Sequence, residues 1–195
     1  MRKAALAGGV LAVLLALWAL LTLARPAGSP AGSSADYPLE EGLRWTYRGA
    51  GNLAVVREIE RTVEVDGRRY REMKFVLPVL GTRAIPMRHS AEGVVTTRDG
   101  REFLLLRFPM VKGDTWTVDL PSEKEVADCA VLGHEEIEFA GRKATATKVE
   151  VRRRTRDGGR ISTDYEWYAP GVGLAKMEVT LGVRATFVLE SFGRR

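Results

Sequence analysis

Hydrophobic and polar positions follow two different patterns along the chain. Residues 4–24 form an unbroken apolar run, preceded by Arg2 and Lys3 and ended by Arg25. From residue 43 onward, apolar and polar residues alternate in short runs rich in Val, Thr, Tyr, Phe, Trp and Arg. Alternation with a period of two is typical of half-buried strands, whereas a long apolar run is typical of an export or membrane-spanning segment.

Short glycine-containing turns separate the alternating runs. They are Asp66-Gly67, Glu92-Gly93, Asp99-Gly100, Ala140-Gly141, Asp157-Gly158-Gly159 and Pro170-Gly171-Val172-Gly173. The pattern predicts an all-β domain, an antiparallel curved sheet or barrel of about 10–12 strands, preceded by one N-terminal transmembrane helix or signal segment. The expected strands are 43–49, 53–65, 68–77, 83–90, 93–98, 101–108, 114–120, 125–139, 142–155, 160–169, 173–181 and 183–192.

Residues 122–132 fit two structures. Ser122-Glu123-Lys124-Glu125 matches a capping box, which would begin a helix at Val126. The residues that follow, up to Ile137, do not keep a helical period. We therefore expect a strand from residue 125, with a helical turn at its start as the alternative.

One hairpin can be predicted to its register. Residues that lie opposite each other on facing strands share one face of the sheet. A two-residue turn after residue 156 would mix the two faces, whereas a three-residue loop pairs Val151 with Tyr165 and Arg152 with Asp164. In this interpretation Gly159 supplies the left-handed residue of a bulged loop.

The segment 38–47 recurs as 109–118. Both copies read Pro, apolar, two variable residues, Gly, two variable residues, Trp, Thr and then Tyr or Val. This pattern predicts a tight bend at the glycine, followed by a strand that buries its tryptophan. We interpret the repeat as two similar meanders, about 38–108 and 109–195, that share one core.

The apolar run at residues 4–24 predicts an export segment that contacts the membrane. Its length is near the ~20 residues of a membrane-spanning helix and exceeds the ~7–15 residues usual in a cleaved signal. We expect residues 1–25 to be a single-pass inner-membrane anchor, 26–36 a flexible linker, and 37–195 a single β-domain outside the cytoplasm, in the cell envelope.

A cleaved signal is the alternative to an anchor. Cleavage after Ala31 or Ala35, each with a serine two residues earlier, would leave a periplasmic or secreted protein. A lipid anchor on cysteine is not expected, because the single cysteine, Cys129, lies far from the export segment. A single cysteine also cannot form a disulfide within the chain.

Charge does not point to nucleic acid as a partner. The formal net charge is +5, but Arg2, Lys3 and Arg25 belong to the export segment. Without them, 27 basic and 25 acidic residues remain, a net charge of +2. Because nucleic-acid-binding domains usually carry strongly basic faces, we expect no nucleic-acid role.

No catalytic, cofactor-binding or metal-binding arrangement is expected from the sequence. His134 shares a strand face with Glu136 and Glu138, but no second histidine lies at ligand spacing. The odd spacing of Cys129 and His134 predicts opposite faces of a regular strand, and His89 stands apart from both. We therefore expect a protein that is not an enzyme.

Aromatic residues form the most informative cluster. Trp45, Tyr47, Trp116, Tyr165 and Trp167 are all expected on inner strand faces. Such residues can form an ordinary packed core, or they can line a pocket that accepts an apolar ligand such as an acyl chain. A packed core would favour a purely structural or assembly subunit of an envelope complex, whereas a pocket would favour binding of an apolar ligand.

Three segments resemble a group of exported bacterial proteins. They are 38–45, 108–116 and 166–176, and the last contains the distinctive stretch Trp-Tyr-Ala-Pro-Gly-Val-Gly-Leu. Together they resemble TapB-like β-domain proteins, which are often lipoproteins, although this chain lacks the acylated cysteine at its export segment. The resemblance implies an exported envelope protein with a fold distantly similar to the LolA/LolB lipoprotein carriers. It implies no catalytic residues. Together with the aromatic cluster, it leads us to expect that this protein binds an apolar ligand or a protein partner.

The first prediction concerns the export segment. We expect the full-length protein to fractionate with membranes, because residues 4–24 are long enough to span a bilayer. Cell fractionation followed by intact-mass measurement tests this expectation. A native mass that begins at residue 32 or 36 would contradict the anchor and support cleavage.

Overall fold

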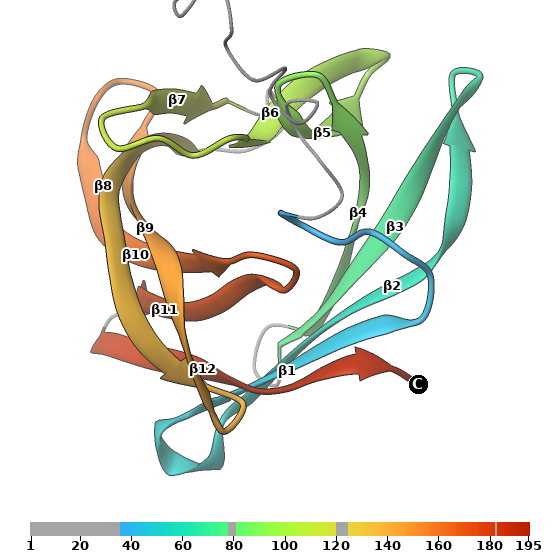
Figure 1. Ribbon diagram of the computed structural model, residues 1–195. Helices are drawn as coiled ribbons and strands as arrows, with labels where there is room; N and C mark the ends of the chain where they lie inside the picture. Colours follow the sequence, from blue (N-terminus) through green and yellow to red (C-terminus); the bar gives the residue numbers. More distant parts are fainter. Residues whose placement is uncertain (1–35, 78–80, 120–124, 182) are drawn as a thin grey trace, which may run out of the picture. The chain divides into compact units, whose positions relative to one another are not determined.

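A computed structural model describes residues 36–77, 81–119, 125–181 and 183–195 (Figure 1). Within these ranges the chain forms twelve strands and one short 3-10 turn, η1 (Ala50–Asn52). The strands are β1 (Leu43–Gly49), β2 (Ala54–Val65), β3 (Arg68–Leu77), β4 (Gly81–Ser90), β5 (Gly93–Arg98), β6 (Arg101–Arg107), β7 (Thr115–Val118), β8 (Glu125–Phe139), β9 (Arg142–Thr155), β10 (Arg160–Ala169), β11 (Gly173–Leu181) and β12 (Val183–Arg194).

All twelve strands belong to one antiparallel sheet. The strand order is β6-β5-β4-β3-β2-β1-β12-β11-β10-β9-β8-β7, so the first and last strands of the chain pair in the middle of the sheet. The two edge strands, β6 and β7, are consecutive in the chain and meet where the Trp116 Nε1–H donates a hydrogen bond to the Leu105 carbonyl oxygen at 3.0 Å. The sheet therefore curves into a nearly closed barrel (Figure 1).

The expected fold class is confirmed. The domain is all-β, and most strands begin and end within two residues of the expected positions. Residues 120–124 lie outside the described residues, so the alternative helical turn is untested, while the strand does begin at Glu125. Residues 1–35, which hold the expected anchor or signal, also lie outside them. None of the helices in the described ranges is both long and apolar enough to cross a membrane.

The expected register of the β9–β10 hairpin is wrong by one position. Tyr165 lies opposite Glu150 rather than Val151, and Asp164 lies opposite Val151. The turn closes between Thr155 and Gly159, which shifts the pairing by two positions from the expected loop, and a bulge at Ile161 then restores one of them. The left-handed residue of the turn is Gly158, with φ of 95°, and not Gly159.

The repeated bend has the same local geometry in both copies. Gly42 and Gly113 have φ of 81° and 94°, and each amide donates to a carbonyl of the strand that pairs with the one after the bend, Ile59 on β2 and Val131 on β8. Trp45 and Trp116 follow these bends and are buried in the same core. The recurrence supports the bend-and-tryptophan unit, while the wider division into meanders 38–108 and 109–195 stays a prediction.

The segment before β1 lies inside the curve of the sheet. The Tyr37 ring stacks on Trp45 of β1 at a centroid distance of 6.4 Å and also lies 6.4 Å from the Tyr168 ring of β10. The Tyr37 carbonyl oxygen lies 2.8 Å from His89 Nε2 on β4. Because these partners come from well-separated strands of the sheet, Tyr37 packs between them.

Gly173 makes room for this tyrosine. It has φ of 80°, and a Cβ added there would lie 2.7 Å from the Tyr37 ring. Gly171, in the same turn, has φ of 71° but open space around it. Both glycines therefore adopt a left-handed backbone conformation, but only at Gly173 would a side chain also collide with the Tyr37 ring.

We predict that Gly173→Ala destabilises the protein more than Gly171→Ala. Each substitution places a side chain in the left-handed region, which costs about 1–2 kcal/mol. Only Gly173→Ala also forces the Tyr37 ring to move, which adds about 1–3 kcal/mol of overpacking. Urea denaturation of the two variants measures the difference, and equal losses would contradict the packing role of Tyr37.

Candidate functional site

The barrel interior contains a cavity of about 390 Å³. It lies between β2, β3 and the strands from β8 to β12. Its walls are both apolar and charged, and its lining residues are Val55, Arg57, Phe75, Glu125, Arg153, Ile161, Ser162, Asp164, Glu166, Met177, Val179, Thr180 and Phe187. Ile161 and Glu125 are exposed, so the cavity reaches solvent at this side. A volume of this size lies within the range of small-molecule sites.

Strand register brings the lining residues together. Arg57 lies directly opposite Phe75 across β2 and β3, and Met177 lies opposite Phe187 across β11 and β12. Directly opposite residues share a face, so these four side chains point to the same side of the curved sheet. The apolar wall of the cavity therefore follows from the antiparallel pairing.

Arg57 is the least satisfied charged group in the cavity wall. Its Nε atom is buried and has no hydrogen-bond partner among the described residues. None of the ion pairs within the described ranges involves it, and Nη2 has only a weak contact to Met177 Sδ at 3.8 Å. The guanidinium carbon lies 5.5 Å from the Tyr47 ring centre and 5.0 Å from that of Phe75. Cation–π contacts stabilise the charge but leave its N–H donors available.

A second pair of charges in the cavity is fully satisfied. Asp164 is buried, and its Oδ2 accepts a hydrogen bond from Arg153 Nε at 2.8 Å. Its Oδ1 accepts a hydrogen bond from the Thr180 amide at 2.9 Å. Burial opposes the charge of Arg153, but the hydrogen bond to Asp164 raises the pKa of Arg153 above its ordinary value. This pair therefore carries no net charge.

Glu166 and three buried tyrosines form the polar side of the interior. The Tyr168 hydroxyl donates to Glu166 Oε2, and the Tyr47 hydroxyl donates to the Leu174 carbonyl oxygen at 2.9 Å. Burial raises the pKa of Tyr37, Tyr47 and Tyr168 above that of a free phenol, and the charge of Glu166 adds to the effect. For Tyr37, the nearby guanidinium charge of Arg57 acts in the opposite direction. All three phenols therefore stay neutral near pH 7 and can donate hydrogen bonds.

The five aromatic residues singled out in the sequence do not share one pocket, which corrects the expectation of a common inner face. Trp45 and Tyr47 face the interior, where the Trp45 Nε1–H donates to the Val172 carbonyl oxygen at 2.7 Å. Trp116 lies at the seam between β6 and β7. Tyr165 and Trp167 lie on the face of β10 opposite that of the cavity-lining residues of the same strand, because side chains alternate along a strand.

Trp167 is buried on that opposite face by charged neighbours. The Nζ atoms of Lys148 and Lys176 lie 4.7 and 4.1 Å from its ring centre, and its Nε1–H donates to Glu135. The two ammonium groups form a cation–π cluster that covers the Trp167 ring on this face. None of the five aromatic residues lines the 390 Å³ cavity, and a ligand contact through them stays a prediction.

Sequence reasoning missed Arg57 and Glu166. Arg57 sits between Val55 and Ile59 at two-residue spacing, so the alternation of β2 places it on the buried face. That alternation predicts an arginine that faces the interior. Glu166 had a weaker signal, because the bulge at Ile161 shifts the face assignment of β10.

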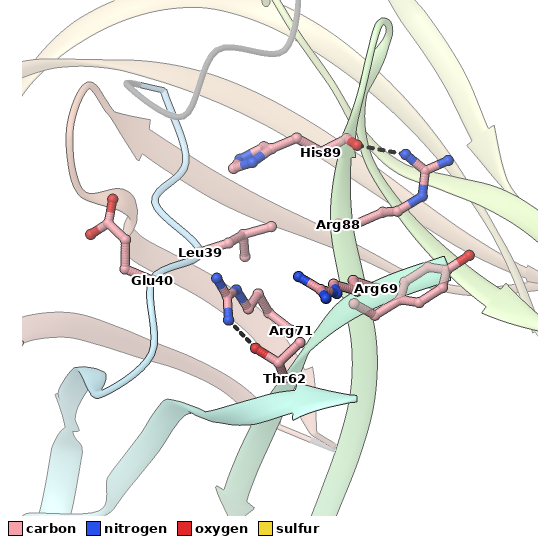
Figure 2. Close-up of a pocket in the computed structure, with 8 residues that line it drawn as sticks. Leu39, Glu40, Thr62, Arg69, Arg71, Arg88 and His89 are labelled. Carbon is pink, nitrogen blue, oxygen red and sulfur yellow. Dashed lines mark hydrogen bonds between the residues drawn. The ribbon is translucent and has the colours of Figure 1, made fainter. Parts of the chain in front are cut away.

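A second cleft of about 440 Å³ lies beside the segment that precedes β1 (Figure 2). Arg69, Arg71 and Arg88 give it a basic character. However, Arg88 binds Glu102 through Nε and Nη2 at 2.5 Å each, and Arg71 contacts Thr62 and lies 3.5 Å from Glu41. Ion pairs on a solvated surface contribute little free energy. We therefore favour the interior cavity as the candidate site.

The histidine and cysteine residues form no catalytic assembly in the described part of the chain. A bulge between Val131 and Gly133 brings Cys129 and His134 to the same face of β8, which corrects the expectation of opposite faces. Their partners on β9 are four residues apart, about 13 Å along a strand. His134 instead lies 3.0 Å from the Thr147 hydroxyl. Among the described residues, no group of three or more His, Cys, Asp or Glu side chains could hold a metal ion.

The fold is similar to that of a solved bacterial protein. A predicted exported protein of Bacteroides fragilis with a YmcC-like fold matches with a TM-score of 0.52 and 16% identity, over 81% of this chain and 98% of that chain. A predicted lipoprotein of Parabacteroides distasonis (TM-score 0.44, 17% identity, 80% and 97% covered) and the hypothetical lipoprotein YmcC of Escherichia coli (0.40, 12%, 90% and 94%) match less well.

The match to the Bacteroides protein shows a common fold. The TapB-like assignment and the distant similarity to LolA/LolB are not tested by it and stay predictions. No protein-family model matches the chain. No curated protein matches it either.

We predict that Cys129 resists alkylation in the folded protein. Burial, reinforced by the charge of Glu166, raises the pKa of the Cys129 thiol to about 12, so the reactive thiolate is scarce at pH 8. Iodoacetamide labelling followed by mass spectrometry should show slow modification of the native protein and rapid modification in urea. Rapid labelling of the native protein would contradict the burial of this thiol.

Proposed function

We propose that this chain is a cell-envelope protein, not an enzyme, whose β-barrel binds an apolar ligand in its interior cavity. The observation that carries the proposal is the 390 Å³ cavity with its exposed rim. A solid core would have favoured a purely structural or assembly subunit. A cavity walled by Val55, Phe75, Met177 and Phe187 instead offers apolar surface to a chain-like ligand.

Two observations support the envelope location. The apolar run at residues 4–24, with Arg2 and Lys3 before it, has the composition of an export segment. The Bacteroides protein that shares the fold is itself described as exported. The location is compatible with either an anchor or a cleaved signal, and with the resemblance to TapB-like exported proteins.

The apolar wall also explains why a chain is preferred over a compact polar ligand. Phe75, Met177 and Phe187 come from three strands of the cavity wall, and the first two contact Arg57. Removing apolar surface from water contributes about 25 cal/mol per Å². An acyl chain that lies along this wall would therefore gain binding energy at each methylene group.

We predict that Val179→Trp reduces the amount of ligand that purifies with the protein. Val179 lines the cavity, and the larger ring would occupy the space that a chain needs. Mass spectrometry of lipids extracted from the purified full-length protein should show a several-fold loss relative to the unchanged chain.

Val76→Trp is the matched control, because Val76 is exposed and does not line this cavity. It should leave the amount of ligand unchanged. Thermal unfolding of both variants checks that the fold is kept. If the unchanged chain is folded and carries no apolar ligand, the result would favour the assembly subunit.

A further inference from the structure

The charges that face the interior cavity leave a deep polar region with no net charge. Arg57 and Glu166 both line the cavity, and no ion pair of 4.0 Å or less joins them in the described part of the chain. Arg153 and Asp164 neutralise each other. Glu125 is exposed at the rim, where solvent screens it. The deep charges are therefore one guanidinium and one carboxylate, held apart.

We propose that the cavity selects a single-chain amphiphile with an uncharged head group that both accepts and donates hydrogen bonds. This inference rests on the proposed function and adds the chemistry of the head group. The head lies between Arg57 and Glu166, accepts from the guanidinium and donates to the carboxylate. The chain lies along the apolar wall beside Phe75 and Met177.

The unsatisfied donor at Arg57 supports this placement. A buried N–H without a partner costs free energy, and a ligand oxygen beside Nε would remove that cost. Arg57 cannot lose its proton to relieve the cost: burial opposes its charge, but a guanidinium stays protonated in proteins, and the nearby Glu166 carboxylate favours the charged form. An oxygen acceptor is therefore the complement of this site.

The carboxylate of Glu166 decides the charge of the head. One of its oxygens already accepts from the Tyr168 hydroxyl, and carboxylates have capacity for further donors. A ligand carboxylate would place a second negative charge near Glu166 in a partly desolvated site. A ligand ammonium group would meet the same penalty at Arg57. A hydroxyl or amide head satisfies both residues without either cost.

A matched series of ligands tests the inference. Decanol, decanoic acid and decylamine share one chain and differ in the charge of the head. Photoreactive diazirine versions can be bound to the full-length chain in lipid nanodiscs, with competition by each unlabelled ligand and peptide mapping of the label. We expect saturable labelling of cavity-lining peptides, with decanol the strongest competitor by roughly tenfold.

Charge variants sharpen the test. Glu166→Gln leaves Arg57 unbalanced, so the preference should move to decanoic acid by roughly tenfold. Arg57→Gln leaves Glu166 unbalanced, so the preference should move to decylamine. Arg48→Gln and Glu190→Gln remove the same charges from an exposed pair outside the cavity and should leave the order unchanged.

The outcomes separate the two proposals. No saturable labelling by any of the three ligands would overturn ligand binding itself, and this inference with it. Saturable labelling with no preference among the heads, or an order that neither cavity variant changes, would overturn the head-group inference alone. Circular dichroism of each variant, with Arg57→Lys as the substitution that keeps the charge, shows whether a lost preference reflects a lost fold.

Discussion

The pairing of β1 with β12 is the contact on which the barrel depends. These strands are the first and last of the domain, yet Leu43 lies opposite Arg194 in the middle of the sheet. The pairing joins two six-stranded halves that are otherwise local meanders. It is also the contact of longest sequence separation, so its closure entropy must be offset by packing around it. The buried Trp45 and Leu189, which lie on β1 and β12, supply part of that packing.

Closure of the sheet creates an interior that must be filled or left as a cavity. One region is filled by Tyr37, which enters from the segment before β1 and packs between β1, β4 and β10. Another region retains a cavity in which Arg57 keeps its charge without an ion pair. A protein selected for stability alone would gain from an apolar residue at this position. Arg57 is the residue at which the proposed ligand would replace the missing hydrogen-bond partner.

The sequence pattern was sufficient to locate the strands, but it did not always show which side chains of a strand face the interior. Alternation and glycine turns predicted all twelve strands, because backbone turns are encoded locally. The bulges at Ile161 and near Leu132 each reversed the face of the residues that follow in the same strand. These shifts are why the sequence pattern misplaced Trp167 and His134. A bulge depends on packing between strands, which no local pattern records. Arg57 precedes the bulge of its own strand, between Ile59 and Arg61, and its position on β2 was readable from its buried neighbours.

The face reversal at Ile161 has a consequence for the cavity. Without the bulge, the alternation of β10 would have turned Trp167 inward and filled the interior with an indole. With it, Asp164 and Glu166 face the cavity, and Trp167 is covered outside by two lysines. One inserted residue therefore places two carboxylates, and not the indole of Trp167, on the cavity-facing side of β10. Because the bulged residue, Ile161, also forms part of the exposed rim, the same local irregularity shapes both the entrance and the charge of the site.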